Sequence, residues 1–155
     1  MIPAAGVDVT APTDDIVFTL GEVAWVDGKA YTYIQANGAI TGDGYVVTFK
    51  QTFDAAMLTT SNDVEGWYVG VAEAAFTDNQ YGWVQVYGAC GIRTEQDATI
   101  TKLGATADAG QVDDAAASGL YIDGMHLGTA TGGADAVNTT GYLNWPTIQV
   151  RMTPV

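Results

Sequence analysis

The sequence predicts an all-β fold, a single small β-barrel or sandwich with an extended N-terminal arm. Three observations predict it. Short segments rich in Val, Ile, Thr, Tyr and Trp alternate in polarity with the period of a strand. Nineteen glycines and many aspartates separate these segments as turn residues. Apolar residues at helical spacing never continue beyond about two turns of a helix. Residues 113–118 could therefore form one short helix at most.

The N-terminal arm is expected to span residues 1–21, followed by a β-barrel domain over residues 22–155. The arm contains two prolines and shows no period, so we expect order in it only against a partner. Ile2, Val7 and Val9 offer apolar anchors at extended spacing. We therefore expect the arm to reach over a neighbouring subunit or another partner surface.

The first predicted hairpin has Asp27 and Gly28 at its tip. Residues 21–26 and 29–36 alternate in polarity on either side of this pair. A two-residue Asp-Gly loop is a strong hairpin signal, because both central residues must take a positive φ. On the second strand the two tyrosines share one face and the two alanines share the other.

A second hairpin is predicted in the middle of the chain. Residues 66–76 and 81–94 flank the polar turn 77–80. Val84 and Val86 alternate with aromatic residues, and we expect the valines to face the core. The aromatic side chains are then expected to lie against another surface.

The remaining strands are short and lie between turns rich in glycine and aspartate. We expect one further hairpin around residues 108–110 and a closing strand near the C-terminal end. The strands predicted outside the two hairpins above are residues 45–50, 55–60, 100–107, 111–114, 120–131 and 142–152.

Composition excludes several classes of partner. Five Lys and Arg against eighteen Asp and Glu give a net charge of −13. The five cations are scattered singly, so no basic patch is present to neutralise phosphates, and nucleic acid is not an expected partner. No apolar run approaches the roughly 20 residues of a membrane span, and the first residues lack the basic segment of a signal peptide. We therefore expect no membrane partner.

Few residues could support catalysis. The sequence has no GxSxG, GxxxxGK[ST], HExxH or CxxC motif, and its only histidine is His126. A Ser/His/Asp triad would need Ser61 or Ser118, and Ser118 lies in a flexible-looking AAASG stretch. Cys90 stands between small residues, which is typical of a buried and unreactive thiol. We expect no catalytic residue and no cofactor.

Carboxylates leave two alternatives open. Glu73 and Glu95 lie near aromatic strands and could act as the acid pair of a small glycosidase. Asp108, Asp113 and Asp114 lie in one loop region but lack the D-x-D-x-D-G spacing of a calcium-binding loop. A solvated acidic surface is the favoured interpretation, with no metal site.

The sequence contains four tryptophans and eight tyrosines, which the catalytic and charged features considered above do not explain. A surplus of these rings together with few charges is typical of surfaces that pack on another protein. The predicted interface residues are Ile2, Val7, Val9, Trp67, Trp83, Tyr87 and Trp145.

Several sequence blocks resemble the decoration, or cement, proteins of tailed-bacteriophage heads. The blocks are VGVAEAAFTDNQYGWVQVYGACG (residues 69–91), IDGMHLGTA (122–130) and LNWPTIQVR (143–151). Together with VDGKAYTYIQANGAITGDGYVV they cover most of residues 22–151, and YGWVQVYG is the most distinctive. Decoration proteins have binding surfaces rather than a site motif, so no residue role is carried over.

The resemblance implies a β-barrel-like structural virion protein without enzymatic activity. Its partners would be the major capsid protein and further copies of itself, commonly as a homotrimer. It would be made in the host bacterial cytoplasm and bound to the outer surface of an icosahedral head, which it stabilises. The alternative is a carbohydrate-binding head-fibre or tail accessory module, in which the same rings line an exposed platform. The direction in which these rings point distinguishes the two.

Overall fold

The computed structural model describes residues 6–100, 102–115, 119–133 and 137–150. Within these ranges the chain is all-β, as predicted, and it contains no helix that could span a membrane. The strands are β1 (Val23–Val26), β2 (Lys29–Ala36), β3 (Val46–Phe49), β4 (Asp54–Met57), β5 (Tyr68–Ala72), β6 (Tyr81–Thr94), β7 (Gly104–Ala105), β8 (Val112–Asp113), β9 (Leu120–Leu127) and β10 (Val137–Val150).

Both predicted hairpin tips are present. Asp27 and Gly28 connect β1 to β2 with φ of 50° and 77°, as a two-residue turn with two positive φ angles requires. Residues 77–80 form the turn between β5 and β6, which pair antiparallel. The period-2 pattern and the turn residues therefore place these strands correctly. The last predicted strand begins earlier than expected, because β10 already pairs with β6 from Val137.

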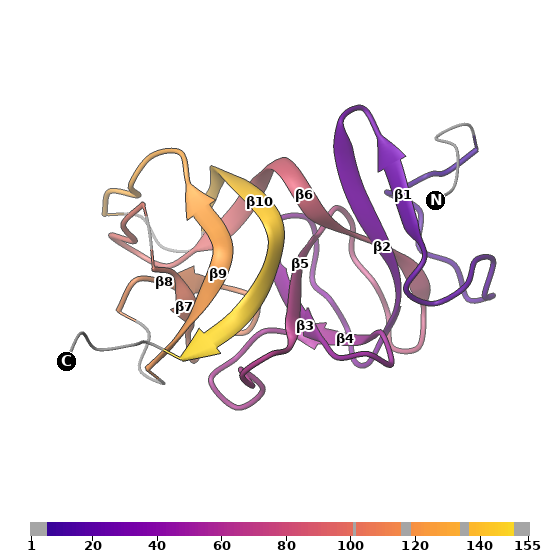
Figure 1. Cartoon of the computed structure of the whole chain (residues 1–155), viewed down its shortest axis with the longest axis horizontal. Helices are drawn as coiled ribbons and strands as arrows, with labels where there is room; N and C mark the ends of the chain where they lie inside the picture. Colours follow the sequence, from indigo (N-terminus) through magenta and orange to yellow (C-terminus); the bar gives the residue numbers. More distant parts are fainter. Residues whose placement is uncertain (1–5, 101, 116–118, 134–136, 151–155) are drawn as a thin grey trace.

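The strands belong to one mixed sheet whose pairings return to their starting point in the N-terminal half. β2 pairs with β6, β6 with β5, β5 with β3 and β3 with β4, all antiparallel, and β4 pairs with β2 in parallel. Figure 1 shows β2 to β5 toward the centre and right of the molecule, with β6 entering from the left. Their buried apolar side chains form one core, which includes Ile34, Val47, Phe49 and Val84.

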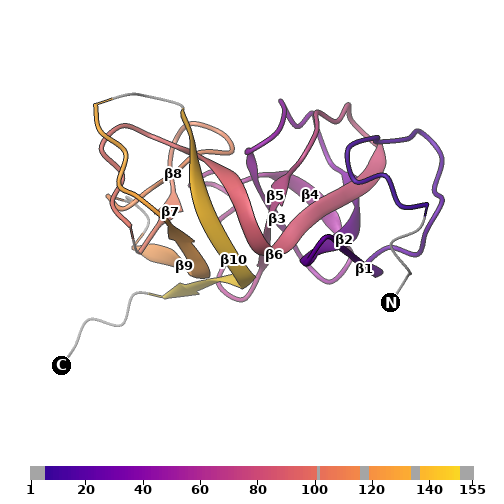
Figure 2. The same cartoon turned by 90° about the horizontal axis from the view of Figure 1, so that it is seen from above.

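A second core lies in the other half of the molecule. The C-terminal part of β6 pairs with β10, and β10 pairs with β9. Ile92, Leu103, Leu127 and Ile148 are among the buried side chains there. Figures 1 and 2 show β6 passing from one half to the other, with β10 beside it. The two halves therefore share β6, a strand of 14 residues.

The N-terminal segment lies against its own chain. Val7, Val9, Phe18 and Leu20 pack on a third apolar cluster on β1, β2 and β6. Thr13 bridges to Tyr81 with backbone hydrogen bonds of 2.8 Å in both directions. We expected order in this arm only against a partner. Val7, Val9, Phe18 and Leu20 instead pack, partly buried, on aromatic rings of their own sheet, which offers a hydrophobic gain without a second molecule.

Candidate binding surface

A row of paired residues crosses four neighbouring strands. Trp25 lies opposite Ala30, Ala30 opposite Tyr87, and Tyr87 opposite Asn144. The ring centroids of Trp25 and Tyr87 are 5.3 Å apart although a strand runs between them. Ala30 is fully buried and small, so the two larger rings meet across it. The row leaves the Tyr87 ring partly open to solvent.

A second row lies two residues further along the same strands. Ala89 pairs with Tyr142, and Tyr142 pairs with His126. The Tyr142 ring is stacked on the His126 ring, with centroids 5.4 Å apart and planes inclined by 25°. Paired positions share a face of a sheet and alternate along each strand, so Tyr87 and Tyr142 lie on the same face. The Tyr142 side chain is 44% exposed.

Trp145 lies in a bulge of β10, three residues after Tyr142. Leu143 pairs with Met125 and Thr147 with Asp123, so three residues of β10 lie opposite Gly124 alone. Trp145 has a φ of 50° and its side chain is 45% exposed. A positive φ is a genuine outlier for a bulky residue and is further disfavoured before a proline. The bulge therefore holds Trp145 on the surface at the cost of backbone strain.

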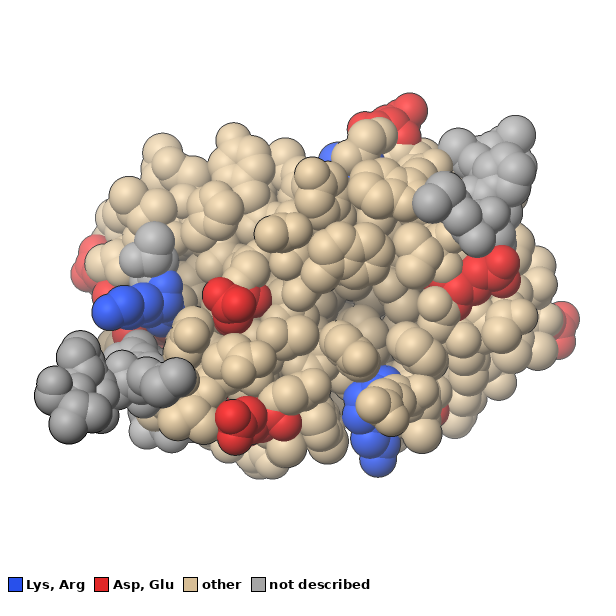
Figure 3. Space-filling view, viewed as in Figure 1, with Lys and Arg blue, Asp and Glu red and all other residues tan. Residues whose placement is uncertain are grey.

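Tyr87, Tyr142 and Trp145 together are called the aromatic patch below. In the view of Figure 3, charged side chains are sparse and are separated by broad uncharged surface. Partly exposed Tyr and Trp rings offer large apolar area to a partner and carry no charge that must be desolvated. The patch is therefore suited to contact with another molecule through apolar rather than ionic interactions.

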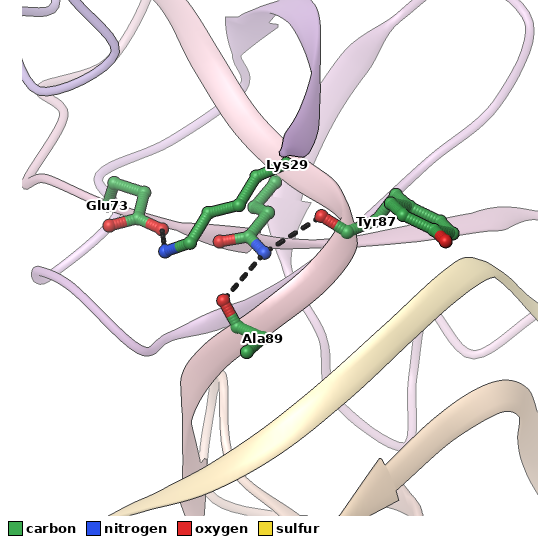
Figure 4. A network of polar contacts seen from close by, with 5 residues as sticks. Lys29, Glu73, Tyr87 and Ala89 are labelled. Carbon is green, nitrogen blue, oxygen red and sulfur yellow. Dashed lines mark hydrogen bonds and ion pairs between the residues drawn. The ribbon is translucent and has the colours of Figure 1, made fainter. Parts of the chain in front are cut away.

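Gln85 supports the patch from the interior. Its Nε2 atom donates to the carbonyl oxygens of Tyr87 and Ala89, at 2.9 and 3.0 Å (Figure 4). The side chain is fully buried beside the register shift at which β6 leaves β2 and joins β10. Buried carbonyls need donors, and this amide supplies two at the irregular part of the strand. It fixes the backbone that carries Tyr87.

Lys29 and Glu73 lie beside the same bend, with Nζ and Oε1 4.0 Å apart (Figure 4). Both side chains are partly exposed, so this ion pair contributes little to stability. Burial, together with the negative charge of Glu73, raises the pKa of the Tyr31 hydroxyl. Burial, with Glu73 again adding to it, raises the pKa of the Cys90 thiol to about 12. Both groups therefore stay protonated at neutral pH.

The structure separates the residues that could have formed catalytic pairs. Cys90 pairs with Gly141, and His126 pairs with Tyr142, the next residue of β10. Consecutive residues of a strand face opposite sides, so the thiol and the imidazole lie on opposite faces of the sheet. Ala72, next to Glu73, pairs with Val84. Glu95 follows the far end of β6, some ten residues along the strand at roughly 3.3 Å each, well beyond the spacing of a glycosidase pair.

The acidic loop considered for calcium shows no metal cluster. Asp113 and Asp114 lie side by side, and the Asp114 backbone N–H donates to the Asp113 carboxylate at 2.8 Å. Over the described residues, no three His, Cys, Asp or Glu side chains come together in an arrangement that could hold a metal ion.

The predicted interface residues fall into three environments. Tyr87 and Trp145 are exposed and belong to the aromatic patch. Trp83 is only 2% exposed and packs beneath the N-terminal segment, together with the partly buried Val7 and Val9. Trp67 is half-buried against the second core and lies outside the patch. Ile2 lies outside the described residues.

The predicted interface residues did not include Tyr142. They also did not include Trp25 and His126, whose rings contact members of the patch. Tyr142 lies within a predicted strand, and its outward direction follows from the burial of Leu143 and Gly141 on either side. The alternation of Tyr142 with the apolar Leu143 along the strand is the local signal that could have found it. The contact between Trp25 and Tyr87 depends on strand order, which has no local signal.

Comparison of the chain with models of protein families, with curated proteins and with solved structures finds no match.

Proposed function

We propose that this protein is a structural virion protein: a decoration, or cement, protein that binds the outer surface of an icosahedral phage head and stabilises it. The aromatic patch is the observation that carries the proposal. It presents three exposed rings on neighbouring strands, in a molecule with few cations and a net charge of −13. The resemblance of the sequence blocks to decoration proteins supplies the identity of the partner, the major capsid protein.

The geometry of the patch supports contact with a protein. Aromatic side chains in preorganised positions lose little conformational entropy on binding and dominate interface energetics. Tyr87 and Tyr142 are held by their contacts with Trp25 and His126, and the bulge fixes the backbone at Trp145. The rings are therefore partly immobilised before any partner arrives.

Stabilisation of a shell follows from mass action. A protein that binds only the assembled lattice stabilises it by about 2.7 kcal/mol per site at a hundredfold excess over Kd. Many copies on one head multiply this effect even when each site is weak. Chemistry is not required for such a role, and we propose that the protein is not an enzyme.

We further propose that the N-terminal half is a small β-barrel and that the protein acts as a homotrimer. The ring of pairings through β2, β6, β5, β3 and β4 supports the barrel. Trimerisation would let several weak contacts act together at high effective concentration. Sedimentation of the protein free and on heads tests this point, and a monomer in both states would refute it.

A carbohydrate-binding accessory module remains the competing function for the aromatic patch. In that case the three rings would stack against a glycan. One face of Tyr142 is already covered by His126, and Tyr87 already contacts Trp25, so the rings do not form an open, flat row. This arrangement favours the protein partner.

Particles with and without the protein provide the functional test. We expect heads that carry it to resist heat-induced and chelator-induced DNA release better than heads that lack it. Because attachment depends on apolar contact, high salt should not remove the protein, and screening of repulsion among copies should favour occupancy. Equal resistance of both particle types would refute the cement role.

A further inference from the structure

A pocket of about 390 Å³ lies at the start of β5, between residues 50–52 and 65–68. Small-molecule sites commonly have volumes of roughly 300–1,000 Å³, so this pocket has room for a small ligand. None of the three members of the aromatic patch lines it. Its ligand and that of the patch can therefore be tested separately.

Backbone hydrogen bonds hold both walls of the pocket. Gly66 N–H donates to the carbonyl of Ile148 at 2.8 Å, and Ile148 N–H donates to the carbonyl of Trp67 at 2.9 Å. On the opposite wall, Phe53 N–H donates to the carbonyl of Lys50 at 2.9 Å and closes the turn after β3. The site is thus largely preformed, which reduces the entropy cost of binding.

The pocket combines aromatic rings with hydrogen-bonding groups of both kinds. The Tyr68 side chain is 40% exposed, and Lys50 Nζ lies 5.7 Å from the centroid of the Trp67 ring. Lys50 donates hydrogen bonds, Glu65 accepts them, and the Gln51 amide can do both. The electron-rich faces of the rings can pack against C–H groups, while the polar groups can bind hydroxyls.

This combination selects one class of ligand. A purely apolar ligand would leave the hydrogen-bonding groups of Lys50, Gln51 and Glu65 unused. The lining carries one cationic side chain, Lys50, and one anionic side chain, Glu65, so the pocket has no net formal charge that would select an ion of either sign. A neutral sugar offers C–H faces for the rings and hydroxyls that donate to Glu65 and accept from Lys50. We propose that this pocket binds a neutral saccharide by one pyranose ring.

The test uses saturation-transfer NMR with methyl α-glucoside, methyl α-mannoside, methyl β-galactoside and N-acetylglucosamine at millimolar concentrations. At least one should receive saturation from the wild-type protein. Tyr68→Ala and Glu65→Gln should each weaken that binding by roughly tenfold or more. These two substitutions lie on exposed positions, and the far-UV spectrum of each variant verifies folding.

Tyr142→Ala is the matched control, because Tyr142 is exposed to a similar extent but belongs to the aromatic patch. It should bind the sugar as the wild type does. Absence of transfer to all four sugars would overturn the proposal, as would unchanged binding by both pocket variants. Loss of binding in Tyr142→Ala alone would assign the sugar to the patch and would count against both the pocket and the cement role.

Discussion

Gly124 of β9 faces the backbone of Asn144 so closely that a Cβ atom on residue 124 would lie 2.5 Å from the Asn144 carbonyl oxygen. Gly124 also has a φ of 78°. This position therefore requires glycine for two independent reasons, space and backbone conformation. The close approach is what allows β10 to bulge and to turn Trp145 outward.

Gly124→Ala should disrupt this bulge. The new methyl group meets backbone rather than a flexible side chain, so β9 and β10 must separate locally. We expect a loss of about 1–3 kcal/mol in the free energy of unfolding, measured by chemical denaturation. Gly132→Ala is the control, because a Cβ atom there meets nothing within 4 Å. Equal stability of the two variants would show that the bulge tolerates a side chain at residue 124.

Gln85→Ala should destabilise the bend of β6. The substitution removes two hydrogen bonds and leaves the carbonyls of Tyr87 and Ala89 without this donor. We expect a cost of about 2–4 kcal/mol in the free energy of unfolding. Gln51→Ala, at an exposed glutamine, should change it by less than about 0.5 kcal/mol. A Gln85 variant as stable as the wild type would mean that water replaces the amide.

Deletion of residues 1–12 should expose the rings beneath the N-terminal segment. Val7 and Val9 then no longer pack on the cluster that contains Trp83. We expect tryptophan fluorescence to shift to longer wavelength and the free energy of unfolding to fall by about 1–3 kcal/mol. Deletion of residues 1–5, which keeps both valines, is the control. Unchanged fluorescence and stability in the longer deletion would show that this packing contributes nothing in solution.

Stability should fall at alkaline pH partly because of Cys90. Burial raises its thiol pKa from 9.0 to about 12, so the folded state disfavours the thiolate. Its contribution is complete below pH 9.0 and is lost as the pH rises from 9.0 to about 12. Cys90→Ala should therefore lose less stability than the wild type between about pH 8 and about pH 10.5, measured by denaturation. An identical loss in both proteins would contradict the shifted pKa.

Local patterns predicted much of this fold. Alternation and turn residues give the bounds of β2 and β6 to the residue and the positive φ angles at Asp27 and Gly28. The burial of Val84 and Val86 also follows from alternation. These features depend on residues that are neighbours in sequence, so one segment carries the full signal.

Long-range pairing accounts for most of what the sequence did not predict. Trp83 is buried in a cluster to which the N-terminal segment contributes, and no pattern around residue 83 indicates that contribution. The outward turn of Trp145 depends on Gly124 of a different strand. A proline inside a strand indicates a bulge or an edge, but it does not give the conformation of the preceding residue.

Binding to phage heads that lack the protein is the most direct test of the proposed function. Co-sedimentation at low and high salt should show saturable attachment of the wild type at both salt concentrations. Trp145→Gly relieves the positive φ, so its stability should stay within about 1 kcal/mol of the wild type. Its attachment should nevertheless weaken by roughly tenfold or more. The control, Ile100→Ala, removes a side chain that is similarly exposed, at 47%, outside the patch, and it should attach normally. No attachment of the wild type, or equal attachment of Trp145→Gly and Ile100→Ala, would contradict a capsid-binding role for the aromatic patch.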